Sequence, residues 1–205
     1  DPNRLFSDMA QQLQEGISRA QGYGEKLPPT YFKYEVIDYD LLGVEDNQGN
    51  LRITVKGFNP IPLPSFLEGP VRLMKISGRE KSQEITGAVK ESDLFDEKLQ
   101  LFKVNAPLEG QSHEIGRARA FTPGWLENES IWMHMSFKYL LEMLKSGLFT
   151  DFYEAFRNHL PAFMAPEVYG RSPLENSSFI VSSAHPDEFL HGNGFVARLS
   201  GSTAE

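Results

Sequence analysis

Near its N-terminus the chain places an apolar residue at every fourth position, at Leu5, Met9, Leu13 and Ile17. This spacing puts the four side chains on one face of a helix, so the pattern predicts a helix over about the first 20 residues. Helical spacing recurs later in the chain. There it predicts helices over residues 65–77, 81–90 and 131–145, and another that begins at residue 151.

Alternation of apolar and polar residues predicts β-structure after the first helix. Residues 31–44 are rich in Tyr, Val and Ile, and residues 51–58 (LRITVKGF) alternate with a period of two. The turn-forming sequence NQGN at residues 47–50 separates them. We therefore expect a β-hairpin or extended arm over residues 31–58, with an ordered loop as the alternative. The expected fold is a single domain that is mainly α with this small hairpin region.

The helix predicted over residues 131–145 is preceded by polar residues and contains one in its first turns. Its apolar residues cover most of its circumference, which is typical of a helix buried among other helices. Glu127, Asn128 and Glu129 precede it and suit helix capping, but a carboxylate here also suits sugar binding or general-base catalysis. His134 is either a hydrogen-bonded core residue or a ligand-binding group.

Composition and charge exclude several classes of protein. The net charge of -8 argues against nucleic acid or an anionic membrane as the main partner. Cysteine is absent, and no apolar run reaches the ~18 residues of a membrane-spanning helix. Glycine-rich phosphate loops and the HExxH zinc motif are also absent. We expect a cytoplasmic protein without cofactor or metal, because His185 and His191 beside two acidic residues are too weak a signal for a metal site.

Arginine and serine residues in the predicted loops are candidate anion ligands. Arg117, Arg119 and Arg171 lie in otherwise uncharged or aromatic loops, where a guanidinium group can bind phosphate or carboxylate. An ion pair with an acidic residue of the chain is the alternative for each. Residues 199–203 (LSGST) precede a predicted helix start, which suits an anion or simple capping.

Several of these segments resemble the cellobiose phosphorylase family. The resemblance is carried by GWLENESIWMHMSFKYLLEML at residues 124–144, PEVYGRSP at 166–173 and RLSGSTAE at 198–205. The upstream segments FLEGPVRLMK and LFDEKLQLFKVNAPL are similar too, and the segments follow the same order. The resemblance implies that nearly the whole chain is the later half of an (α/α) barrel catalytic domain.

The same resemblance implies an activity and a set of site residues. Family members split β-linked disaccharides and oligosaccharides with inorganic phosphate as co-substrate, inverting the anomeric centre to give an α-sugar 1-phosphate. By motif position, His134, Ser200 and Gly201 would bind phosphate. Glu127 and Tyr169 would lie at the sugar site.

Arg171 lies two residues after Tyr169 in the PEVYGRSP segment, and we expect it to bind substrate together with Glu127 and Tyr169. The family's general-acid aspartate has no counterpart in this sequence, so we expect it outside the chain and expect the chain alone to be inactive. The expected partners are an oligosaccharide, phosphate and the remainder of the catalytic domain, from the same polypeptide or another chain. A homo-oligomer is compatible with the sequence.

Two alternatives remain open at this point. The first is an inverting glycoside hydrolase of the same barrel type, with Glu127 or Glu129 as the general base. The second is a non-catalytic carbohydrate-binding module, which the missing acid and the aromatic loops favour.

Overall fold

The computed structural model describes residues 1–23, 26–160, 163–165, 167 and 178–195, and within them the fold mixes α and β elements. The described α-helices are α1 (Pro2–Gln21), α2 (Glu68–Met74), α3 (Arg79–Lys90), α4 (Met133–Lys145) and α5 (Phe149–His159). These residues form no closed barrel. None of the described helices is both long and apolar enough to cross a membrane.

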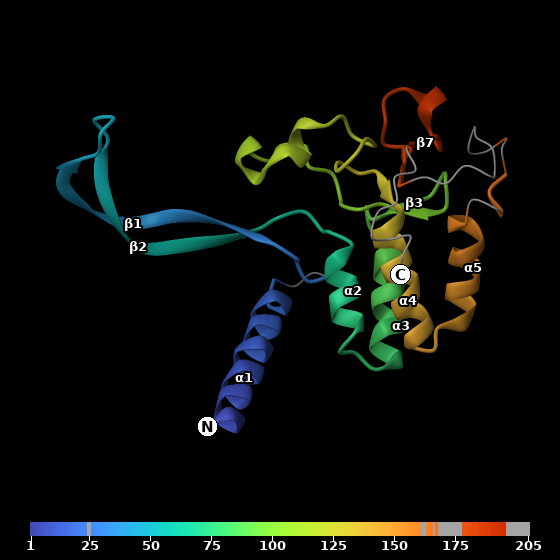
Figure 1. The fold of residues 1–205 in the computed structure, drawn as a ribbon, viewed down its shortest axis with the longest axis horizontal. Coiled ribbons are helices and arrows are strands. Elements are labelled where there is room, and N and C mark those ends of the chain that lie inside the picture. The colour runs from blue at the N-terminus through green and yellow to red at the C-terminus, as the bar shows by residue number, and fades with distance from the viewer. Residues whose placement is uncertain (24–25, 161–162, 166, 168–177, 196–205) are drawn as a thin grey trace. The chain divides into compact units, whose positions relative to one another are not determined.

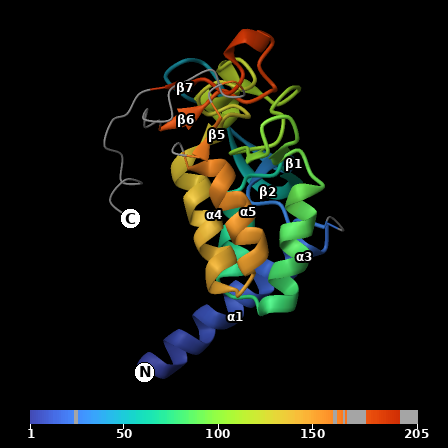
Figure 2. The ribbon, with the colours of Figure 1, turned by 90° about the vertical axis from the view of Figure 1, so that its right-hand side faces the viewer.

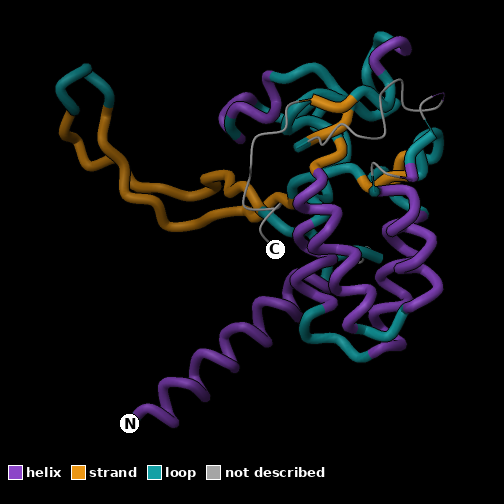
Figure 3. The backbone as a smooth tube through the Cα atoms, turned by 45° about the vertical axis from the view of Figure 1, so that its right-hand side comes forward, coloured by secondary structure: helices purple, strands orange, loops and turns teal. Residues whose placement is uncertain are grey.

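The expected hairpin is present and forms a compact unit of its own, residues 31–63. Strand β1 (Phe32–Glu45) pairs antiparallel with β2 (Leu51–Pro62), which extends four residues past the predicted end. At the turn, one carboxylate oxygen of Asp46 accepts two backbone N–H groups, at 2.8 and 2.9 Å. Figure 3 shows the two strands in orange. Most side chains of both strands are exposed.

Helix α1 forms because Asp1 caps it, accepting the N–H of Asn3 at 3.0 Å, and because Pro2 presets the first helical turn. None of its residues is buried, and Leu5, Phe6 and Leu13 are more than half exposed. Its amphipathic pattern therefore has no covering surface within the described chain.

Helices α2, α3, α4 and α5 lie side by side and enclose the main core (Figures 1 and 2). The core joins Val71 and Met74 of α2 to Val89 of α3 and Tyr139 of α4, all at most 2% exposed. The ring of Tyr139 packs edge-on against Phe102, with 4.8 Å between ring centroids. The sequence pattern that predicted a buried helix over 131–145 thus describes the inner face of α4.

Short strands and turns gather at the end of the helices where α4 begins. Strands β3 (Phe95–Asp96) and β4 (Leu101–Phe102) pair antiparallel. Three further strands at this end form a sheet in the order β5 (Ile131–Trp132), β6 (Phe179–Ile180) and β7 (Gly194–Phe195). Short 3₁₀ turns complete this end, namely η1 (His113–Ile115), η2 (Arg117–Ala120) and η4 (Glu188–Leu190).

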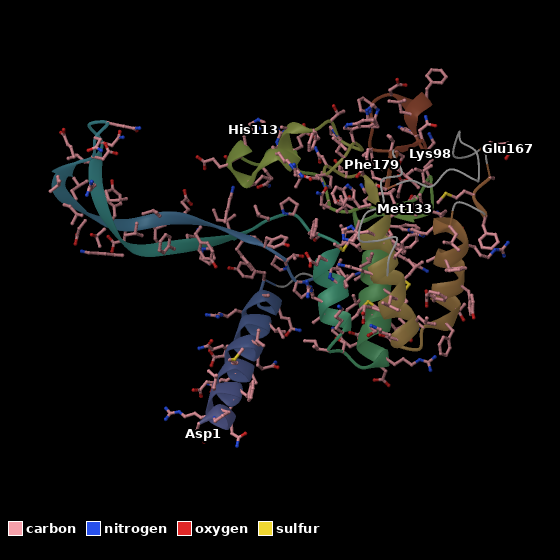
Figure 4. The ribbon with its side chains drawn as sticks, in the orientation of Figure 1. Asp1, Lys98, His113, Met133, Glu167 and Phe179 are labelled. Atoms are coloured by element: carbon pink, nitrogen blue, oxygen red, sulfur yellow. The ribbon has the colours of Figure 1, made fainter. Side chains whose placement is uncertain are left out.

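Asp96 connects two of these segments. Its carboxylate is 2% exposed and accepts the backbone N–H and the hydroxyl of Ser183, at 2.6 and 2.8 Å. It also accepts the N–H groups of Lys98 and Leu99, at 3.1 and 3.0 Å. Four donors satisfy a carboxylate that would be costly to bury alone. Figure 4 shows Lys98 and Phe179 at the same end of the helices as Met133.

Candidate functional site

The candidate site lies where the chain enters α4, and a glycine fixes its start. Gly124 accepts the backbone N–H of Ser182 through its carbonyl at 3.2 Å. Its φ is +78°, and an added Cβ would lie 2.5 Å from the backbone nitrogen of His185. Only glycine combines this conformation with so close an approach. The contact holds the segment before α4 against the segment after β6.

Residues 125–130, which we call the Glu127 loop, hold two side-chain-bearing residues at positive φ. Leu126 has φ of 49° and Glu129 has φ of 55°, in a region that such residues rarely adopt. Surrounding groups brace the loop, because the carbonyl of Leu126 accepts the indole N–H of Trp132 at 2.7 Å and the hydroxyl of Ser130. Strained backbone held by several contacts is characteristic of functional sites.

Capping of the following helix, which was one of the two roles open to Glu127, Asn128 and Glu129, is not the role that they have. Helix α4 begins at Met133, its N-cap residue Trp132 makes no side-chain capping bond, and the N–H of Met133 donates to the carbonyl of Ser178 at 3.1 Å. The physical reason is β5, whose two residues pair with β6 and keep the chain extended between the loop and the helix. The start of a helix carries partial positive charge.

Glu127 is oriented by Arg117. The Nε of Arg117 donates to both carboxylate oxygens of Glu127, at 2.8 and 3.1 Å, and its Nη2 donates to Oε1. These hydrogen bonds and the charge of Glu127 raise the pKa of the Arg117 guanidinium. The Glu127 side chain is 24% exposed and that of Arg117 is 78% exposed. An ion pair this exposed adds little stability, but its bidentate geometry fixes the carboxylate.

For Arg117 the structure therefore has the ion pair that was the alternative to anion binding. Arg119 donates its Nε to the carbonyl of Gln111 at 3.3 Å.

Glu129 points inward instead of toward solvent. Its carboxylate accepts a hydrogen bond from the ammonium group of Lys103 at 3.1 Å. The Glu129 side chain is only 8% exposed and the Lys103 side chain 11%. Beside it, Asn105 accepts the backbone N–H of Glu129 at 2.7 Å and donates to the carbonyl of Glu127 at 2.6 Å. Sequence reasoning missed Lys103 and Asn105. The available signal was two polar residues at alternate positions of the apolar stretch LFKVNAPL.

His134 lies in the first turn of α4 and lines a groove between α4 and α5 of about 330 Å³. The groove walls are mainly apolar, with Leu141, Leu144 and Phe152 among them, and Lys138 lies one helical turn beyond His134. The rings of His134 and Trp132 are 6.0 Å apart. His134 therefore follows the Glu127 loop closely in the sequence and lies at the start of α4.

His159 and His191 have structural roles. His159 is fully buried, donates through Nδ1 to the carbonyl of Ala155 at 2.7 Å and accepts the N–H of Phe102 at Nε2. Burial lowers the pKa of His159 to about 4. His191 donates to the carbonyl of His185 at 2.7 Å and accepts from a lysine side chain. No group of three potential metal ligands occurs among the described residues.

Four predicted site residues lie outside the described residues: Tyr169, Arg171, Ser200 and Gly201. Of the predicted site, the structure thus describes Glu127 and His134, and β5 lies between them in the sequence.

Comparison of the chain with models of known protein families and with curated proteins found no match. The candidate site therefore rests on its geometry and on the motifs described above.

Proposed function

We propose that this chain forms the phosphate side of the active site of an inverting β-glycoside phosphorylase. In such an enzyme an oxygen of inorganic phosphate attacks the anomeric carbon and the glycosidic C–O bond breaks. An acid protonates the leaving oxygen, and the product is an α-sugar 1-phosphate. β-Linked gluco-oligosaccharides are the substrates that the motif resemblance supports.

One observation carries the proposal: the strained and braced Glu127 loop, directly ahead of α4. The loop presents a carboxylate held by Arg117 at the surface, with the start of α4 only a few residues further along the chain. An ionised carboxylate accepts hydrogen bonds and suits the hydroxyl groups of a sugar. A braced loop keeps this acceptor in place before the ligand arrives, which is the requirement for precise orientation.

Phosphate would bind beside this loop, at the start of α4. The dipole of α4 favours an anion near the start of the helix, and His134 adds a side-chain donor in the same turn. Ser200 and Gly201 would complete the phosphate site, and Tyr169 and Arg171 the sugar site. The acid would come from another part of the catalytic domain.

The apolar surface of α4 and α5 supports the (α/α) barrel part of the proposal. Leu141 and Leu144 of α4 and Phe149 and Tyr153 of α5 are between 36% and 62% exposed. A helix pair with so much uncovered apolar surface suits further helices packed beside it. In the proposed domain, the neighbouring helices of the barrel would cover this surface.

The carboxylates of the loop favour phosphorolysis over hydrolysis. An inverting hydrolase needs a carboxylate that can take a proton from water. Glu129 is buried against Lys103, and Glu127 is engaged through both oxygens by Arg117. Neither carboxylate is placed as a free base, whereas phosphate needs no such base because it is itself the nucleophile.

The role of His134 can be tested in the complete enzyme, in which the catalytic acid is present. The variant His134→Ala should raise the KM for phosphate by about 10- to 100-fold, because a hydrogen bond to a charged group is worth about 1.5–3 kcal/mol. The KM for the disaccharide should change much less. The exposed His113, remote from α4 in sequence, provides the control variant His113→Ala. An unchanged KM for phosphate in His134→Ala would remove this histidine from the phosphate site.

A further inference from the structure

Residues 103–106, which we call the clamp segment, lie between two neighbouring parts of the chain and are hydrogen-bonded to both. The N–H of Val104 donates to the carbonyl of Ser130 at 2.8 Å, and the carbonyl of Val104 accepts the N–H of Leu67 at 2.9 Å. Residues 103 and 106 are held in the same way, by bonds to the carbonyls of Leu94 and Ser65 at 2.7 and 2.8 Å. The segment is therefore fixed on both edges.

Lys103 and Asn105 are the polar residues of the clamp segment. Both reach the Glu127 loop. Lys103 binds the Glu129 carboxylate at 3.1 Å, and Asn105 binds the backbone on both sides of Asn128. Both residues are nearly buried, with 9% and 5% of their surface exposed.

Asparagine is suited to this position because one amide group offers a donor and an acceptor. Its Nδ2 meets the carbonyl of Glu127 at 2.6 Å and its Oδ1 meets the N–H of Glu129 at 2.7 Å. Aspartate would keep only the acceptor, and an apolar residue would leave both backbone groups unpaired. The two bonds hold the loop between its two positions of positive φ, Leu126 and Glu129.

The clamp also separates the two carboxylates of the loop. Lys103 draws Glu129 inward, so the neighbouring carboxylate of Glu127 is the one that remains partly exposed and is met by Arg117. Without the clamp, the two positive-φ residues would have fewer contacts to hold them in a rarely adopted conformation.

We propose that Lys103 and Asn105 are the positioning residues of the saccharide site: they hold the Glu127 loop in its binding conformation without touching the ligand. The identity of the ligand rests on the function proposed above, whereas the positioning role rests only on the clamp geometry. Loss of the clamp should weaken saccharide binding more than it changes the stability of the helical core.

The two tryptophans of the chain give a local test, because both belong to this site: Trp125 lies in the loop, and Trp132 donates its indole N–H to Leu126. In the variant Asn105→Ala, the ¹H–¹⁵N signal of the Trp132 indole should move toward its free position. Affinity for cellobiose, measured by calorimetry on the complete enzyme carrying the same substitution, should fall about tenfold or more, because small misplacements of binding groups are costly.

The matched control is Val89→Ala, which removes two methyl groups from a fully buried position in α3. It lowers stability through a core cavity. It should leave both indole signals in place and the cellobiose affinity within about twofold, whereas a purely structural role of Asn105 would make the two variants alike. If Asn105→Ala fails to fold, the double variant Lys103→Met/Glu129→Gln removes the buried pair without leaving a lone charge and should show the same signal shift.

Unchanged indole signals in the folded clamp variants would overturn the positioning role, whatever the chain binds. Shifted signals with unchanged cellobiose affinity would overturn it as well. If the unsubstituted complete enzyme binds no cellobiose while the signals still shift, the clamp stands and the proposed sugar function fails.

Discussion

His159 illustrates how a single residue couples this fold to pH. Its ring stacks on Phe102 with centroids 5.2 Å apart, and both ring nitrogens are hydrogen-bonded within the chain. The acceptor role of Nε2 requires a neutral ring, and burial lowers the pKa to about 4, against about 6.5 in an unfolded chain. Because the folded pKa is depressed, the associated stability is present above pH 6.5 and is lost as pH falls toward 4.

We expect the free energy of unfolding to fall by an amount on the order of 3 kcal/mol between pH 6.5 and pH 4 through His159 alone. The variant His159→Gln retains a donor and an acceptor but does not titrate, so its stability should depend less on pH across this range. Urea unfolding at several pH values measures the slope of the free energy of unfolding against pH for each protein. Equal slopes in the two proteins would show that His159 does not titrate on unfolding.

At the scale of elements, the sequence predicts the helices well and the entry into α4 poorly. Helical spacing predicted α3 and α4 because their buried faces follow the period of the helix. The cap prediction for Glu127 and Glu129 failed because their partners, Arg117 and Lys103, come from segments 10 and 26 residues away. Capping preferences describe neighbours along the chain, and here tertiary partners outweighed them.

A pair of glycines tests the contact that fixes the start of the Glu127 loop. Gly124 and Gly110 have nearly equal φ, 78° and 77°, but only at Gly124 would a Cβ strike another backbone. Gly110→Ala should cost about 1 kcal/mol from the backbone conformation alone. Gly124→Ala should cost at least about 2 kcal/mol more, because the segment at His185 has to move. Thermal unfolding compares the two variants, and equal losses would show that the close approach does not constrain the loop.

At the scale of the whole molecule, the described chain leaves several apolar surfaces uncovered. The stripe on α1, one side of α4 and α5 and many residues of the hairpin are exposed. The sequence predicted the hairpin from its period of two and its turn residues. It could not predict that the hairpin forms a separate compact unit, because that depends on which residues lack long-range contacts.

The same limit applies to the candidate site. Motif position alone suggested Glu127 and His134. The roles of Lys103 and Asn105 depend on hydrogen bonds between the clamp segment and the Glu127 loop, which are distant in sequence. Residues that bind a ligand leave a signature in local sequence more readily than the residues that position them. For this reason the proposed function rests on the loop geometry as much as on the motifs.

The most direct test of the proposed function is the product formed from cellobiose by the complete enzyme, with and without inorganic phosphate. Phosphorus and proton NMR identify the product and its anomeric configuration. We predict that cleavage requires phosphate and yields α-glucose 1-phosphate and glucose in equal amounts. Release of glucose alone, at the same rate without phosphate, would contradict the proposal and identify the enzyme as a hydrolase.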